Sequence, residues 1–203
     1  MILGIASPVW GEREGRKSPW AGHRLWLAHS AGGAVGGAVI GGLVAMAGVP
    51  FQTLISSPVR TALALAIAAL AILFDIGLVR PPHTGRQVPA TWTAEVGPVR
   101  AFAYYGAILG AGLLTFVPIG LTYALAAFGV LVLPPLVAVV AFVAFGAART
   151  IATGPLALRP VSASALLYRQ PRYRRWWRTA SLCVVALLGG LVLLKEFGHG
   201  PMA

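Results

Sequence analysis

Charged side chains are scarce in this sequence. Only 10% of its 203 residues are charged and five are acidic, whereas 58% are hydrophobic. Soluble domains carry about 25% charged residues, so this chain has too little charge to cover a water-soluble particle. The same composition excludes intrinsic disorder, which goes with low hydrophobicity. We therefore expect an integral membrane protein.

Cysteine and enzyme motifs are also missing. Cys183 is the only cysteine, which excludes an internal disulfide and dithiol redox chemistry, and we expect it to be a small packing residue. The sequence contains no H-E-x-x-H, G-x-S-x-G or paired-acid motif, and neither His23 nor His29 has a second ligand one helical turn later. We therefore expect no catalytic residues, no metal site and no cofactor.

Long apolar runs are present instead. A transmembrane helix needs about 20 mostly apolar residues. Four runs meet this description: 29–48, 61–79, 134–148 with its flanks, and 179–194. The uncharged segment 101–133 is too long for one simple helix and is interrupted at Pro118, so it counts as one span or two.

The basic residues decide between these counts, because cytoplasmic loops are enriched in Lys and Arg. With one span in 101–133, every basic residue except Arg60 and Lys195 falls on the inner side. Two spans would move the most basic loop, 149–178, to the outside. We therefore expect an all-α bundle of about five transmembrane helices, with the N-terminus inside and the C-terminus outside. Segment 119–133 is then a kinked extension, an interfacial helix or a re-entrant segment.

This topology divides the chain into four parts. They are a cytoplasmic N-terminal segment (1–28), a four-helix membrane core (29–153), a basic aromatic cytoplasmic loop (154–178), and a fifth transmembrane helix with a short outer tail (179–203). Within the core, 29–80 and 100–150 each combine a glycine-rich helix, a proline that breaks it and a helix that ends in arginine. The pattern indicates either a duplicated hairpin or similar composition alone.

Small residues recur at helical spacing. They are Gly33, Gly37 and Gly41 in the first span, and Gly106 and Gly110 in the third. A four-residue spacing aligns them on one helix face and lets another backbone approach closely. We expect these glycines to be helix-packing residues within one bundle; contact with a partner subunit is the alternative.

Asp75 is the only acid inside an expected span. An acid at membrane depth needs a partner or a water-filled cavity. The expected topology places several basic groups at the same cytoplasmic level, which predicts an intramembrane polar cluster of Asp75, Arg80, Arg100, Arg149 and His29. A structural ion pair is favoured over a proton or ion relay, because Asp75 lies near the end of its helix.

A run of alternating basic and aromatic residues precedes the last span. Its members are Arg169, Arg172, Arg174, Arg175, Trp176, Trp177 and Arg178. Tryptophan rings favour the membrane interface, and guanidinium groups bind anionic headgroups. We expect a surface for anionic lipids or a partner protein. We do not expect nucleic-acid binding, because the position beside a span explains the composition.

Residues 87–92 (QVPATW), 100–112 (RAFAYYGAILGAG) and Thr115 carry a resemblance. This part of the chain, about 86–150, resembles small polytopic membrane proteins of high-GC Gram-positive bacteria. Those are distantly similar to the membrane family that conducts electrons between thiols for cytochrome c maturation. The resemblance implies a bundle with proline-broken helices in the bacterial cell (inner) membrane. Pro50 and Pro118 follow the glycine-rich helices, where the redox branch relies on cysteines, so electron transfer is not implied.

These observations favour a non-catalytic membrane subunit. The glycine faces and the basic loop indicate a chain that anchors or completes a larger membrane complex involved in transport or export. Its expected partners are other membrane-protein subunits and anionic lipids. The repeated hairpins, their prolines and Asp75 keep a second hypothesis open, a stand-alone transporter of a small solute or an ion.

Overall fold

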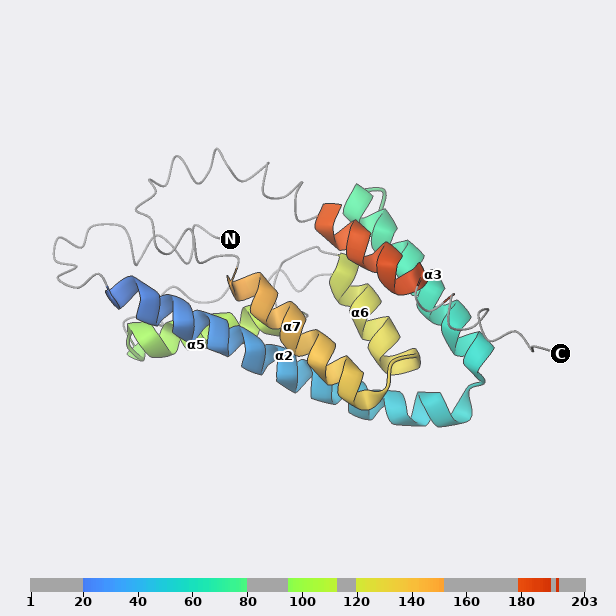
Figure 1. Ribbon diagram of the computed structural model, residues 1–203, viewed down its shortest axis with the longest axis horizontal. Coiled ribbons are helices and arrows are strands. Elements are labelled where there is room, and N and C mark those ends of the chain that lie inside the picture. Colours follow the sequence, from blue (N-terminus) through green and yellow to red (C-terminus); the bar gives the residue numbers. More distant parts are fainter. Residues whose placement is uncertain (1–19, 80–94, 113–119, 152–178, 191–192, 194–203) are drawn as a thin grey trace. The chain divides into compact units, whose positions relative to one another are not determined.

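The fold is all-helical wherever the structure describes the chain. The computed structural model describes residues 20–79, 95–112, 120–151, 179–190 and 193 (Figure 1). Its helices are α2 (Trp20–Leu54), α3 (Ser57–Ile76), α5 (Pro98–Ala111), α6 (Gly120–Leu131), α7 (Pro135–Ile151) and the C-terminal helix (Thr179–Gly190). The prediction of an all-α fold is confirmed for these residues.

Two of these helices are long and apolar enough to cross a membrane. They are α2, over His23–Leu54, and α3. Only 33% of the most apolar window of each is buried, whereas the core helix of a soluble protein is mostly buried. Helices α6, α7 and the C-terminal helix are apolar but shorter. The count of five spans therefore stays a prediction.

Helix α2 is longer than the expected span 29–48. It has 35 residues, about 52 Å at 1.5 Å per residue, against a hydrocarbon core of about 30 Å. The prediction that Pro50 breaks this helix is wrong, because Pro50 lies inside it. Proline lacks the N–H that would donate to the carbonyl four residues earlier, yet the helix continues beyond it to Leu54. In the turn after the proline, Thr53 Oγ1 donates to Val49 O (3.2 Å) and Pro50 O (3.0 Å).

Glycines end the next two helices. Helix α3 ends in a Schellman motif, in which Gly77 has a φ of 85° and donates to Phe74 O (3.2 Å) while Leu78 N donates to Leu73 O (3.0 Å). Helix α5 ends before Gly112, whose φ is 71°. The break in 101–133 thus begins at Gly112, ahead of Pro118, which lies outside the described residues.

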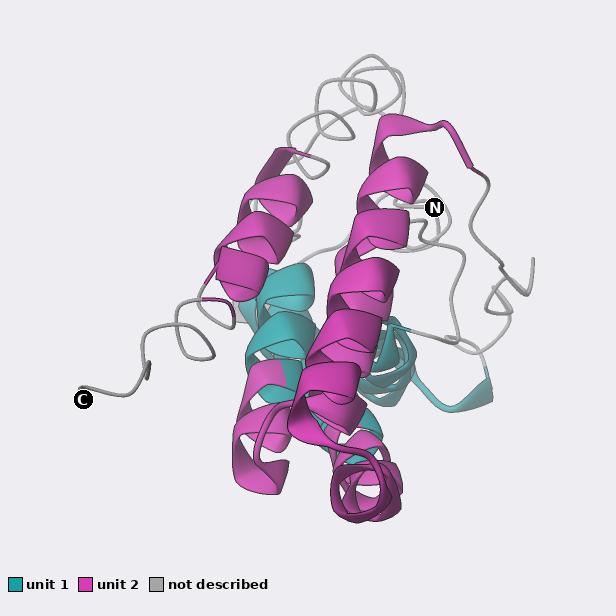
Figure 2. Ribbon diagram, turned by 90° about the vertical axis from the view of Figure 1, so that its right-hand side faces the viewer, with its two compact units in different colours: residues 1–40, 84–116, 142–173 teal, residues 41–83, 117–141, 174–203 magenta. Residues whose placement is uncertain are grey.

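The chain forms two compact units, each built from three segments (Figure 2). Unit 1 comprises 1–40, 84–116 and 142–173, and unit 2 comprises 41–83, 117–141 and 174–203. Helices α2 and α7 contribute residues to both, so both units draw on the 29–153 core. The two expected repeats also differ: 29–80 holds two helices, whereas 100–150 holds three.

In unit 1, α2 and α5 run in the same direction. Gly32 lies against Ala103 O, and one turn later Gly36 lies against Ala107 O. The absence of side chains at both glycines lets the two backbones touch. The N-terminal end of α5 therefore lies at the same end of unit 1 as the N-terminal end of α2.

Helix α7 runs against α2 in the same unit. Gly33 lies against Thr150, near the C-terminal end of α7, whereas Gly37 lies against Phe142 O. Residue numbers rise along one helix as they fall along the other, so the pair is antiparallel. The C-terminal end of α7 consequently belongs to the end of unit 1 where α2 and α5 begin (Figure 1).

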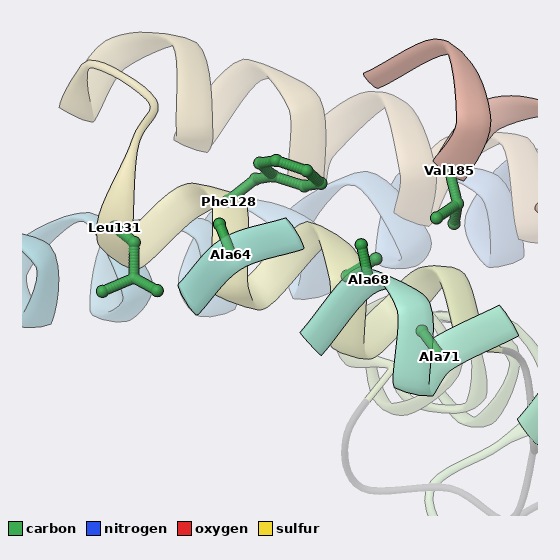
Figure 3. Packing of buried hydrophobic residues seen from close by; sticks show 7 residues of the cluster. Ala64, Ala68, Ala71, Phe128, Leu131 and Val185 are labelled. Atoms are coloured by element: carbon green, nitrogen blue, oxygen red, sulfur yellow. The ribbon is translucent and has the colours of Figure 1, made fainter. Parts of the chain in front are cut away.

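An alanine face of α3 packs on α6 in unit 2. Ala64, Ala68 and Ala71 are buried at spacings of four and three residues, which places them on one face (Figure 3). Phe128 of α6 is fully buried in this cluster, which also includes Ala124, Leu131 and Val185. The next position on the face, four residues after Ala71, is Asp75.

Candidate functional site

Asp75 is held by two hydrogen bonds inside unit 2. The residue is 1% exposed. Its Oδ1 accepts from the backbone N–H of Gly120 (2.8 Å), the first residue of α6, and its Oδ2 accepts from Ser181 Oγ (2.6 Å) on the C-terminal helix. Ser181 Oγ in turn accepts from Leu121 N (3.1 Å). One carboxylate and one hydroxyl thus receive the first two N–H groups of α6.

This arrangement is a helix cap supplied by other helices. The first N–H groups of a helix have no acceptor within it, and a negative side chain there is favoured by the helix dipole. In most helices, a Ser or Asp that immediately precedes the helix in the sequence accepts hydrogen bonds from these N–H groups. In this protein Asp75 of α3 and Ser181 of the C-terminal helix perform it together.

The other end of α6 is held as well. Gln52 Nε2 of α2 donates to Val130 O and Leu133 O, both at 3.1 Å. Val130 lies in the last turn of α6, where carbonyls lack a donor within the helix, and Leu133 follows two residues after the helix ends. We call the three side chains Gln52, Asp75 and Ser181 the α6 cradle. The cradle bonds backbone groups at both ends of α6 that have no partner within the helix. Helix α6 has 12 residues and is about 18 Å long, which is too short to cross a bilayer.

The expected polar cluster around Asp75 stays a prediction. Arg80 lies outside the described residues. His29, Arg100 and Arg149 belong to unit 1, whereas Asp75 belongs to unit 2. The partners that the structure gives Asp75 are a backbone N–H and a hydroxyl, which satisfy the carboxylate without a basic side chain.

The basic members of that cluster in unit 1 differ in burial. Arg100 is exposed at the start of α5. His29 is 3% exposed, and its Nδ1 donates to Phe102 O (3.2 Å). His29 Nε2 has no hydrogen-bond partner among the described residues. The contact with Phe102 joins the start of α2 to the start of α5.

Arg149 is a buried arginine of unit 1. It lies in the last turn of α7 and is 6% exposed. Its guanidinium carbon lies 5.3 Å from the centre of the Phe145 ring, a cation–π contact. Neither Nη1 nor Nη2 has a hydrogen-bond partner in the described part of the chain.

The glycines predicted to pack helices are at helix contacts where the structure reports them. Gly106 lies against His29 O, and Gly110 against Gly33 O. Gly33 and Gly37 face α7, as described above, and Gly41 is buried in unit 2. The structure adds five close contacts that the spacing did not predict, at Gly32, Gly36 and Gly146 in unit 1 and at Gly48 and Gly120 in unit 2.

Two other expectations have different outcomes. The basic and aromatic run, Arg169, Arg172, Arg174, Arg175, Trp176, Trp177 and Arg178, lies outside the described residues. Cys183 is exposed on the C-terminal helix, so the prediction of a packing role is wrong. Among the described residues, no three His, Cys, Asp or Glu side chains lie together as a metal site would require.

Unit 2 also contains an apolar groove. Its volume is about 460 Å³, and it is lined by residues of α2, α3 and α6, with Tyr123 as the one lining residue that carries a polar group. The groove has neither an acid nor a nucleophile in its lining. It offers space for an apolar group and no chemistry for a reaction.

Comparison of the chain with family models, with curated proteins and with solved structures gave no match.

Proposed function

We propose that this chain is a non-catalytic integral membrane subunit that anchors or completes a larger complex involved in transport or export. One observation carries the proposal: the polar side chains of the α6 cradle, of which Asp75 and Ser181 are buried and Gln52 half-buried, hold helices together through hydrogen bonds. Asp75 uses both carboxylate oxygens on α6 and Ser181. Gln52 uses its amide on the other end of α6. Such side chains stabilise a scaffold.

The outward face of α2 supports a role in contacts. Val35, Val39, Leu43 and Met46 are each more than half exposed, and their spacing of three and four residues places them on one face. An apolar face of this length is satisfied by lipid or by another membrane protein. We assign the contact with other subunits to this face.

The proposed location is the bacterial cell membrane, with five spans and the N-terminus inside. The helix directions in unit 1 support this topology, since spans one and three would run together and span four would run against them. The resemblance over 86–150 supports the bacterial membrane. Reaction of a cysteine at Ser162, in the basic loop, with a membrane-impermeant maleimide in intact cells would contradict it.

Photo-crosslinking tests the subunit role. A photoreactive amino acid at Val39 or Leu43 is expected to give discrete protein adducts in cells, because this face contacts another subunit. Val140 of α7, which is also exposed, is the matched control for a face in lipid. Affinity purification in mild detergent followed by mass spectrometry identifies the adducted chain and its stoichiometry. A folded, monodisperse chain without partners, and without adducts at Val39 or Leu43, would contradict the proposal.

A stand-alone transporter is the second candidate, and the burial of Asp75 favours it. A carboxylate that is 1% exposed in an apolar bundle is a typical coupling group in ion and proton transport. On this hypothesis Asp75→Asn abolishes solute or ion flux in proteoliposomes while the protein still assembles, because the amide keeps an oxygen for Gly120 N. Normal flux in the variant would exclude Asp75 as the coupling residue.

A further inference from the structure

Arg149 combines deep burial with unused donors. Nine-tenths of its surface is covered, yet Nη1 and Nη2 donate to nothing among the residues that the structure describes. The described residues of unit 1 include one acid, Glu95, which is exposed. Burial of a charge without a counter-charge is strongly unfavourable, in a bilayer as in a protein interior. We therefore expect the guanidinium to bind an anion.

The contact with Phe145 does not supply that anion. A cation–π contact neutralises no charge and supplies no acceptor oxygen for the guanidinium N–H groups. These N–H groups form the planar fork that binds two oxygens of one phosphate or carboxylate group. The ring contact therefore leaves Nη1 and Nη2 available as donors.

The backbone beside Arg149 is rigidly held. Gly146, three residues earlier, lies against Gly33 O and 3.2 Å from Gly110 O, measured from the position of an added β-carbon. Thr150, the next residue, is fully buried against Gly33 and donates to Gly146 O and Ala147 O, both at 3.0 Å. Binding groups on rigid elements lose little entropy when a ligand arrives.

The end of unit 1 that holds Arg149 also holds the start of α2. Two buried polar atoms there, His29 Nε2 and Ser30 Oγ, have no hydrogen-bond partner among the described residues. They belong to the end where the expected topology places the cytoplasmic membrane surface. A ligand that approaches from that surface would therefore reach Arg149 just below it.

We propose that Arg149 is the binding group for a phosphate group at this end of unit 1. A phosphate provides several strong acceptor oxygens in a geometry that the guanidinium fork matches. The source is either the headgroup of an anionic phospholipid or a free phosphate. The proposed site uses none of the residues of the basic run 169–178 or of the α6 cradle. It depends on the membrane location and does not depend on the subunit role.

Lipid retention is the test. The full chain is reconstituted in nanodiscs of phosphatidylcholine with or without phosphatidylglycerol, released into detergent and examined by native mass spectrometry for bound lipid. Arg149→Gln is expected to retain phosphatidylglycerol about tenfold less well than the wild type, the loss expected for one charged hydrogen bond. Arg100→Gln, at an exposed arginine of the same unit, is the matched control and is expected to match the wild type.

Arg149→Lys keeps the positive charge and removes the planar fork of donors, so it is expected to bind lipid more weakly than the wild type. Because it keeps the charge, it also tests the site if Arg149→Gln does not fold. A parallel arm adds inorganic phosphate to delipidated protein and follows thermal unfolding. Stabilisation by phosphate, with no lipid retained, would identify free phosphate as the source. Equal retention of phosphatidylglycerol and equal response to phosphate in the wild type and Arg149→Lys would overturn the proposal.

Discussion

Asp75→Ala is expected to lower the free energy of unfolding in detergent by about 3 kcal/mol, as expected when a charged acceptor is lost and its donors are left buried. The substitution removes the acceptor of Gly120 N and of Ser181 Oγ at once. Both donors lie among buried residues, where water cannot replace the carboxylate. Thermal unfolding of purified protein, followed by circular dichroism, measures the loss.

Three further variants separate the cap from the loss of a buried side chain. Asp75→Asn retains an oxygen acceptor and is expected to cost less than Asp75→Ala. Ser181→Ala removes one of the two hydrogen bonds to Asp75 and the acceptor of Leu121 N, but it leaves the bond from Gly120 N to Asp75, and it is expected to be intermediate. Thr122→Val is the control on α6, because Thr122 is buried and its Oγ1 has no partner among the described residues. If Asp75→Ala were no less stable than Thr122→Val, the cap would contribute nothing.

Gly33→Ala is expected to destabilise unit 1 by about 1–3 kcal/mol, the usual cost of overpacking. A β-carbon on Gly33 would lie 2.7 Å from Gly146 O and would also overlap the side chain of Thr150. The obstacle on one side is backbone, which cannot rotate away. Helices α2 and α7 must therefore separate, and the contact with Gly110 opens as well. Unfolding in detergent, measured as for Asp75, reports the effect.

Gly42→Ala is the matched control, because it makes the same change on the same helix. An added β-carbon at Gly42 has no atom within 4 Å. Alanine favours a helix over glycine by up to about 1 kcal/mol, so this variant is expected to be neutral or more stable. Equal stability of the two variants would show that α2 and α7 do not touch at Gly33.

Spacing alone was enough to predict the glycine contacts. Gly33 and Gly37, and likewise Gly106 and Gly110, recur at the helical repeat, and all four touch a neighbouring backbone in unit 1. The contact of Gly146 was not predicted, because this glycine has no second glycine one helical turn away. A pattern of that kind indicates a contact only after the partner helix is known.

The partners of Asp75 could not be predicted in the same way. Its position on the alanine face follows from spacing, but Ser181 lies 106 residues away in the sequence. The other partner is a backbone N–H, which carries no side-chain signal at all. Arginine is the partner that a sequence suggests for a buried carboxylate, whereas the N–H groups of a helix N-terminus satisfy it equally well. Gln52 did leave a signal, as a polar residue in an apolar run just after Pro50.

Helix boundaries were predicted less well than helix identity. Pro50 was expected to break α2, but the helix continues through it to Leu54. The break in 101–133 begins at Gly112, where a positive φ costs glycine little. A proline is the residue from which a sequence predicts a helix end, but α5 ends at a glycine with a positive φ.

The α6 cradle also sets an order of assembly during synthesis. Translation delivers Gln52 and Asp75 before α6, but Ser181 after it. Helix α6 is therefore made before one of its capping groups. Until the C-terminal helix is made, Leu121 N lacks the hydroxyl that it donates to in the finished protein. The C-terminal helix thus completes the cap of α6, a helix from the middle of the chain. A chain truncated before Ser181 would leave Leu121 N without its acceptor, and we expect such a chain to be less stable.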